Sequence, residues 1–207
     1  EETRRYVVPS APGKRHSGDT KVTDLLYKCY GQAILDDDRE EDFEEILKVI
    51  KDRYDSIING LELTISLDDE FKTIQENFSK KIGRDYAASR GEYLNGIIMA
   101  VYLGYEFIDA AEVIFFDEEG EFDAEKTNEV LSERLAHTER AVIPGFYGSN
   151  PDGTIHTFSR GGSDITGSIV ARAVHADMYE NWTDVSGFLI ADPRIIKNPK
   201  AIDVITY

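Results

Sequence analysis

The sequence predicts an α/β protein: a three-layer αβα sandwich with a mostly parallel central sheet, to which an acidic helical insertion is added. Short apolar runs such as residues 5–8 and 141–143 end at loops rich in proline and glycine, as buried strands do. Segments with apolar residues at every third or fourth position lie between such runs. Strands that alternate with helices favour a parallel sheet covered on both faces.

The remaining elements follow from the same two periodicities. Helical spacing marks residues 128–137 and 164–174, and residues 93–103, which are apolar on nearly all sides, indicate a buried helix. Strand-like spacing marks three others, residues 106–110, 112–116 and 178–182. Asp152-Gly153 predicts a hairpin turn, because this pair tolerates the backbone conformation that a tight hairpin requires.

Residues 36–85, approximately, form the predicted helical insertion. Apolar residues recur there at spacings of three and four, and residues 66–69 resemble the start of a second helix. The segment carries no recognisable chemistry, so we interpret it as scaffold in preference to a lid. The chain, residues 1–207, is then a single domain that contains this insertion.

The charge balance excludes some classes of partner. The chain has 23 Lys and Arg against 40 Asp and Glu, a net charge of −17, so nucleic acid and anionic membrane surfaces would be repelled. The single cysteine, Cys29, allows no internal disulfide, and its apolar surroundings favour a buried thiol over a nucleophile. No apolar run approaches the roughly 20 residues that span a bilayer, and we expect a cytoplasmic location.

Residues 157–164 form the clearest candidate site, because a strand leads into two glycines and a helix follows at once. A helix N-terminus offers unpaired N–H groups and partial positive charge to an anion. Arg160 can hold a carboxylate through two parallel hydrogen bonds, Ser163 can donate another, and Asp164 suits a loop that also orients a cation. Alternatively, Ser163 or Asp164 merely caps the helix and Arg160 lies at the surface. This loop alone leaves both interpretations open.

A second candidate site follows the predicted strand 178–182. Thr183 and Asp184 stand where a nucleotide or a metal ion could be held, and Arg194 is a candidate partner for phosphates. Taken alone, this stretch is explained better by turns in which the aspartates bond their own backbone.

Together the two sites point to a family. Residues 158–164, followed by residues 182–184 and 191–194, resemble the aspartate kinase branch of the amino-acid kinase family. Further motifs of that family are matched, in the family's order, by residues 7–11 with 23–26, 89–92 and 144–148.

The resemblance implies an activity and roles for particular residues. Family members transfer the γ-phosphoryl group of ATP to the β-carboxylate of L-aspartate, the first step towards lysine, threonine and methionine. It implies that Arg160 and Ser163 bind the substrate carboxylate and that Asp164 organises the catalytic groups, so Arg160 and Asp164 are the expected catalytic residues. Glu92 would face the substrate ammonium, while Ser10 and Thr23 line the same pocket.

The resemblance also implies that ATP and Mg²⁺ are required. Thr183, Asp184 and Arg194 would contact the nucleotide. We expect no protein metal ligands, because Mg²⁺ bound with ATP is held mostly by phosphates and water. The substrate carboxylate is already ionised at neutral pH, so none of the four histidines needs a catalytic role.

The chain departs from the family pattern at both ends. The family's opening Lys-Phe-Gly-Gly motif, a second phosphate-binding lysine and the regulatory domains have no counterpart between Glu1 and Tyr207. We therefore expect a partial catalytic domain that turns over no ATP by itself, and a homodimer or higher homo-oligomer for the intact protein. Two alternatives stay open: a related kinase acting on glutamate or acetylglutamate, and a non-catalytic fragment for ligand binding or assembly.

Overall fold

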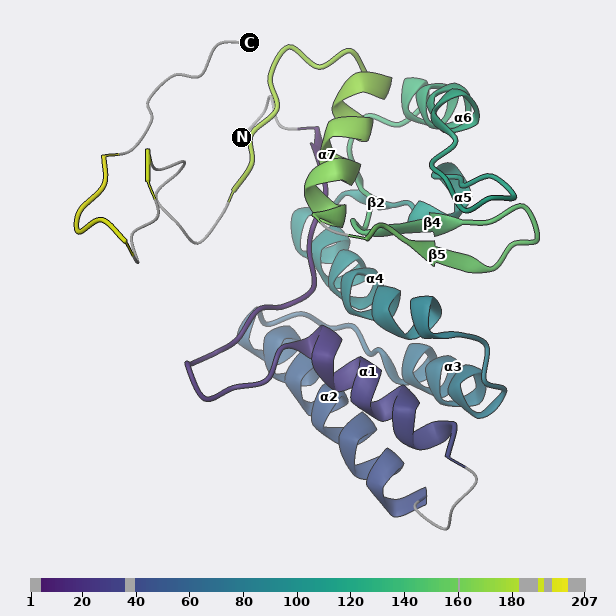
Figure 1. Cartoon of the computed structure of the whole chain (residues 1–207), viewed down its shortest axis with the longest axis vertical. Coiled ribbons are helices and arrows are strands. Elements are labelled where there is room, and N and C mark those ends of the chain that lie inside the picture. Colours follow the sequence, from purple (N-terminus) through teal and green to yellow (C-terminus); the bar gives the residue numbers. More distant parts are fainter. Residues whose placement is uncertain (1–4, 36–39, 160, 183–189, 192–194, 201–207) are drawn as a thin grey trace. The chain divides into compact units, whose positions relative to one another are not determined.

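The computed structural model describes residues 5–35, 40–159, 161–182, 190–191 and 195–200 (Figure 1). The chain divides into two compact units, Glu1–Asp177 and Met178–Tyr207. Every described helix and strand belongs to the first unit. The strand predicted over residues 178–182 is wrong, since no strand forms there and the side chains of Met178 and Trp182 are exposed.

A parallel sheet forms the centre of the first unit. Its strands are β1 (Tyr6–Val7), β2 (Glu106–Phe107) and β3 (Ala141–Val142), in the order β1-β3-β2. Both outer strands run parallel to β3. A separate antiparallel hairpin joins β4 (Tyr147–Ser149) to β5 (Ile155–Thr157), and its turn contains the predicted Asp152-Gly153 pair, with Gly153 at a φ of 82°. The mixed α/β fold with a mostly parallel sheet is therefore confirmed.

Helices lie on both faces of this sheet, and successive strand residues point to opposite faces. Phe107 points towards α4 (Arg84–Leu103), where its ring meets Tyr93 edge-on with centroids 5.5 Å apart. The next residue, Ile108, belongs to a different buried cluster that also contains apolar side chains of α6 (Ala124–Ala136) and α7 (Gly162–Ala173). The sheet thus separates two helical layers.

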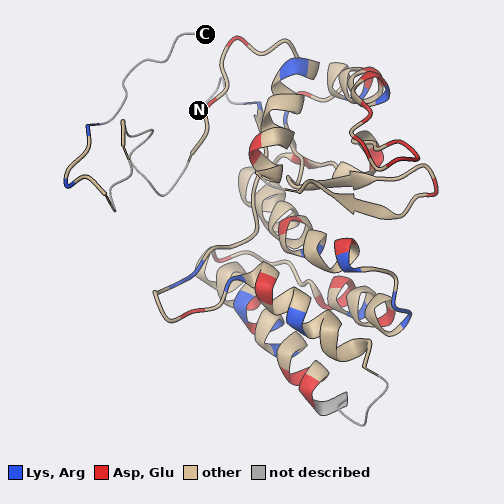
Figure 2. Cartoon of the chain, in the orientation of Figure 1, with Lys and Arg blue, Asp and Glu red and all other residues tan. Residues whose placement is uncertain are grey.

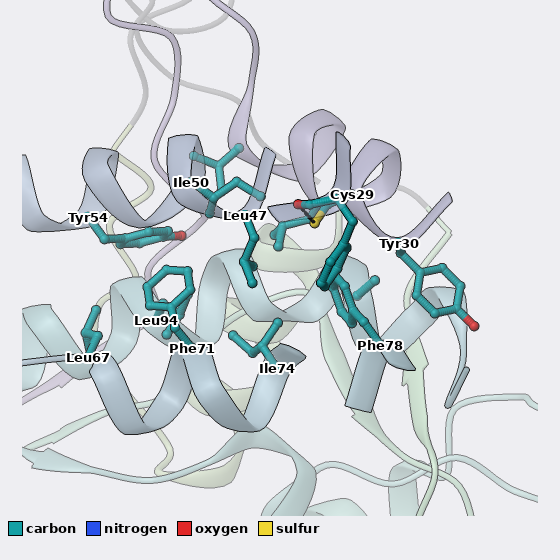
Figure 3. Close-up of a cluster of buried hydrophobic side chains, with 14 of the residues drawn as sticks. Cys29, Tyr30, Leu47, Ile50, Tyr54, Leu67, Phe71, Ile74, Phe78 and Leu94 are labelled. Atoms are coloured by element: carbon teal, nitrogen blue, oxygen red, sulfur yellow. Dashed lines mark hydrogen bonds between the residues drawn. The ribbon is translucent and has the colours of Figure 1, made fainter. Parts of the chain in front are cut away.

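Four helices build a second core next to the sheet (Figure 3). They are α1 (Val22–Ala33), α2 (Glu40–Gly60), α3 (Asp68–Ser79) and the α4 helix. Tyr54, Phe71 and Phe78 are among the buried side chains that hold them together. Cys29 lies in this core, where burial raises the pKa of its thiol to about 12, so its predicted role as a buried thiol is confirmed.

The predicted insertion supplies α2 and α3 to this core. Both helices pack against α1 and α4, so the segment shares a hydrophobic core with the elements that flank it. The assignment of residues 36–85 as an insertion stays a prediction. Across the described ranges, no helix is both long enough and apolar enough to cross a membrane.

The region after β2 differs from the expected pair of strands. Residues Ala110–Val113 form a short helix, α5, because the carboxylate of Asp109 accepts a hydrogen bond from the backbone N–H of Ala111 (3.0 Å) and caps it. The acidic run at residues 117–121 is a turn, visible as a red loop in Figure 2. Asp117 accepts hydrogen bonds there from the N–H groups of Glu119 and Glu121, so the run is a solvated turn.

Candidate active site

A cavity of about 230 Å³ lies where the loops that follow β1 and β3 meet the N-terminus of α7. The two loops are joined directly, since the N–H of Gly145 donates to the carbonyl oxygen of Pro9 (3.1 Å). Ligands of open α/β sheets bind at this place, outside the carboxyl ends of the strands. The lining residues are Ser10, Glu92, Phe146, Gly161, Gly162, Ser163 and Asp164.

Four of these lining residues, Ser10, Glu92, Ser163 and Asp164, are among those predicted from the sequence. Ser10 comes from the loop after β1, and Glu92 comes from α4. Ser163 and Asp164 lie in the first turn of α7, beyond the capping position, which Gly161 occupies with a φ of 58°. Segments more than 150 positions apart in the printed sequence therefore share one cavity.

Close backbone packing joins the first turn of α7 to the loop after β3. A Cβ atom on Gly162 would lie 2.7 Å from the Cα of Phe146, and a Cβ on Gly145 would lie 2.7 Å from the Cα of Ser163. Phe146 has a φ of 81°, which is uncommon for a residue other than glycine. Its N–H donates to the hydroxyl of Thr166 (3.1 Å), which holds this conformation against the helix.

Glu92 is the buried acid of the cavity. It lies in α4 with 6% of its surface exposed, and its Oε2 has no hydrogen-bond partner in the described part of the chain. Desolvation raises the pKa of this carboxyl to about 7, against the opposing effect of hydrogen bonds from backbone N–H groups, including that of Ala11, and of the charge on Arg90. A buried carboxylate oxygen left unpaired beside a cavity suits a cationic group on a ligand.

Arg90 is a second buried charged residue beside the site, and the sequence alone predicted no role for it. Its guanidinium lies 4.2 Å from the ring centroid of Tyr93 and 4.5 Å from that of Tyr86. It also donates to the Ser89 hydroxyl from Nε (3.1 Å) and Nη2 (2.9 Å). Aromatic faces stabilise a desolvated cation, and the charge of Arg90 favours the ionised form of Glu92.

Of the remaining predicted residues, the structure describes Thr23, which lies in the first turn of α1 and does not line this cavity. The other four, Arg160, Thr183, Asp184 and Arg194, lie outside the described residues. Within the described ranges, no group of three or more His, Cys, Asp or Glu side chains is placed to hold a metal ion.

The raised pKa of Glu92 makes a prediction about stability. The usual pKa of a glutamate carboxyl is 4.5, and the pKa of Glu92 in the folded protein is about 7. The contribution of Glu92 to the free energy of unfolding is therefore complete below about pH 4.5 and is lost as the pH rises through about 7. Glu92→Gln should therefore be more stable relative to wild type at about pH 8 than at about pH 5, by up to about 3 kcal/mol. Urea unfolding without ligand measures this difference. Parallel pH profiles for the two proteins would contradict it, and Glu118→Gln in the exposed turn is the control.

A parallel sheet, a ligand cavity at the carboxyl ends of its strands and a glycine-rich helix start define a class of small-molecule-binding α/β domain. Residues 6–207 match the model of the amino acid kinase family, and the chain belongs to that family.

The chain is similar in sequence and in structure to aspartate kinases. It is 37% identical to aspartokinase 3 of Bacillus subtilis over 219 residues, which cover 99% of this chain and 47% of that relative. The structure of Clostridium acetobutylicum aspartate kinase matches with a TM-score of 0.87 and 51% identity, over 97% of this chain and 45% of that one. E. coli aspartokinase III, solved with aspartate and ADP, matches with a TM-score of 0.77 and 25% identity, over 96% and 46%. The chain spans about half the length of these relatives.

Proposed function

We propose that the protein containing this chain is an aspartate kinase, which transfers the γ-phosphoryl group of ATP to the β-carboxylate of L-aspartate. The main support for the proposal is that one cavity contains both a group suited to bind a cation and a group suited to bind an anion. The unpaired buried carboxylate of Glu92 suits an ammonium group, and the first turn of α7, with Ser163, suits a carboxylate. A zwitterionic amino acid carries both groups. The relatives named aspartate kinase, one of them solved with aspartate and ADP, support the same substrates.

The acceptor amino acid is assigned to the cavity residues. Glu92 binds its ammonium group, and Ser163 and Arg160 bind a carboxylate. Asp164 and Arg160 act as the catalytic residues, Asp164 by orienting the groups around the reacting oxygen. Ser10 and Thr23 complete the acceptor pocket. The acceptor carboxylate is ionised at neutral pH and can attack the γ-phosphorus directly, so the protein's main tasks are alignment and charge neutralisation.

We assign nucleotide binding to residues 183–194. Thr183, Asp184 and Arg194 contact ATP, and Mg²⁺ enters with its phosphates. The product, 4-phospho-L-aspartate, opens the route to lysine, threonine and methionine. The cytoplasmic location and the homo-oligomeric state stay predictions.

A panel of acceptors tests the proposal on the protein at its full natural length. ADP release should depend on L-aspartate and should be absent with L-glutamate or N-acetylglutamate. Turnover with glutamate but not with aspartate would show that the protein is a different amino acid kinase. A pure binding module would instead gain about 2.7 kcal/mol of stability at an aspartate concentration one hundred times its Kd and would release no ADP.

A further inference from the structure

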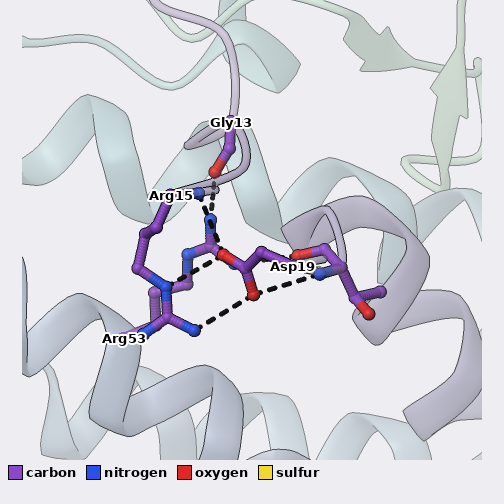
Figure 4. A network of polar contacts seen from close by, with 5 residues as sticks. Gly13, Arg15, Asp19 and Arg53 are labelled. Carbon is purple, nitrogen blue, oxygen red and sulfur yellow. Dashed lines mark hydrogen bonds and ion pairs between the residues drawn. The ribbon is translucent and has the colours of Figure 1, made fainter. Parts of the chain in front are cut away.

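A buried arginine of α2 holds the loop that leads from β1 to α1. The side chain of Arg53 is only 3% exposed. Its Nη1 donates to the carbonyl oxygen of Thr20 (2.8 Å) and its Nη2 to that of Gly13, and it forms an ion pair with the Asp19 carboxylate at 3.1 Å (Figure 4). Three points of the loop, residues 13–20, are therefore fastened to one guanidinium of α2.

The loop closes further around Asp19. The Asp19 carboxylate accepts hydrogen bonds from Nε of Arg15 (2.9 Å) and from the backbone N–H groups of Arg15 (3.0 Å) and Thr20 (3.0 Å). Hydrogen bonds from Arg15, together with the charge of Arg53, hold the pKa of Asp19 well below its usual range. The loop is thus held in one conformation by charged hydrogen bonds that α2 anchors.

The part of the same loop that precedes Gly13 reaches the cavity. Ser10 lines the cavity, and its carbonyl oxygen accepts a hydrogen bond from the Asn95 side chain of α4 (2.7 Å). The following N–H group, that of Ala11, bonds to Glu92. A Cβ on Gly91 would lie 2.8 Å from the Cβ of Ala11, so the chain lies directly on α4 here. Moving the loop would therefore disturb both Ser10 and Glu92.

The next residue of α2, Tyr54, contacts the turn of α4 that carries Glu92. Its side chain is fully buried (labelled in Figure 3), and its hydroxyl donates to the carbonyl oxygen of Gly91 at 2.7 Å. Gly91 immediately precedes Glu92. Neighbouring residues of a helix point about 100° apart, so Arg53 and Tyr54 can reach two different segments. One turn of α2 contacts both the loop that carries Ser10 and the turn that carries Glu92.

We propose that Arg53 and Tyr54 are positioning residues for the amino acid acceptor, so that α2 sets the spacing between the Ser10 loop and Glu92. The proposal rests on the proposed function and gives the helical segment 36–85 a part in acceptor binding. If the Ser10 loop or Glu92 were misplaced, the acceptor would bind more weakly, and the nucleotide contacts would not change. The effect should therefore appear in the KM for the acceptor and be small in kcat and in the KM for ATP.

Tyr54→Phe against Tyr30→Phe is the matched test, on the protein at its full natural length. Both changes remove one hydroxyl of the same core that is bonded to backbone, since the Tyr30 hydroxyl accepts from the N–H of Gly83 (3.1 Å). Tyr54→Phe should raise the KM for aspartate about tenfold, with kcat and the KM for ATP within about twofold of wild type. Tyr30→Phe should leave all three constants unchanged. Equal kinetics for the two variants, or parallel increases in both KM values, would overturn the proposal.

Arg53→Met gives a readout that needs no catalysis. Amide hydrogen exchange at Arg15, Asp19 and Thr20 should become at least about tenfold faster, because the loop loses its anchor. Lys51→Met is the control, since Lys51 lies on the same helix but pairs with Asp55 and Asp68. Unchanged exchange in the Arg53 variant would overturn the proposal.

The proposed function and the positioning role of Arg53 and Tyr54 can be disproved independently of each other. If wild type phosphorylates another amino acid, the aspartate assignment is wrong, and the KM comparison is made with that acceptor. If wild type binds an amino acid without turnover, its Kd replaces KM in the comparison of Tyr54→Phe with Tyr30→Phe.

Discussion

Replacing Glu92 with glutamine should lower kcat/KM for aspartate by a factor between about 30 and about 5,000. Glutamine keeps the shape of the side chain but removes its charge, and losing one partner of a buried charge pair costs about 2–5 kcal/mol. The effect should be large because the Oε2 atom of Glu92 has no partner in the described residues, which leaves it available to the acceptor ammonium. Steady-state kinetics of the purified variant measure it.

The same variant should change the pH profile. Wild-type kcat/KM for aspartate should rise as the pH passes through about 7, where Glu92 ionises, and the glutamine variant should lack this rise. Glu118→Gln, in an exposed turn, should match wild type in both respects. If Glu92→Gln showed wild-type kinetics, Glu92 would have no role in binding the acceptor.

Replacing Gly148 with alanine should lower the free energy of unfolding by about 3 kcal/mol or more, the upper part of the range for an overfilled core. An added Cβ would lie 2.8 Å from the Cγ2 and 2.9 Å from the carbonyl carbon of Ile114. The two segments cannot separate freely, because the N–H of Ser149 donates to the carbonyl oxygen of Ile114 (2.9 Å) and the N–H of Phe116 donates to that of Ser149 (2.9 Å). Urea unfolding gives the difference.

Gly31→Ala is the control for this substitution. Gly31 lies within α1, and a Cβ there would meet nothing within 4 Å. Alanine should therefore stabilise the protein by about 0.5–1 kcal/mol, because glycine loses more conformational freedom in a helix. A Gly148→Ala variant as stable as wild type would show that β4 can move away from Ile114 at little cost.

The sequence predicted those elements whose local pattern and tertiary environment agree. The start of α7 is one example, because Gly161 and Gly162 permit both a left-handed turn and close contact with Phe146. Residues 110–113 are a counterexample. Their apolar pattern resembles a strand, but the Asp109 cap starts a helix at that point. The sequence pattern alone could not reveal this, since a four-residue helix is much shorter than the window of about 11–18 residues over which helical periodicity is recognised.

The residues of the candidate site also divide into those that the sequence predicts and those that only the structure reveals. Glu92, Ser163 and Asp164 belong to short sequence motifs that can be recognised without a structure. The structure shows that all three line one cavity. Arg53 and Tyr54 stand in no motif, and they matter only through contacts with Thr20 and Gly91, which lie 33 and 37 positions away. Helical periodicity assigns Tyr54 to a core and Arg53 to no particular partner. Only the packing of α2 against α1 and α4 shows what they hold.

Identification of the phosphorylated product tests the central claim most directly. The protein at its full natural length is incubated with ATP, Mg²⁺, L-aspartate and hydroxylamine, which converts an acyl phosphate into a stable hydroxamate. We predict one aspartate β-hydroxamate for each ADP released, and none without ATP. ADP release without the hydroxamate, or a hydroxamate formed only when glutamate replaces aspartate, would contradict the assignment.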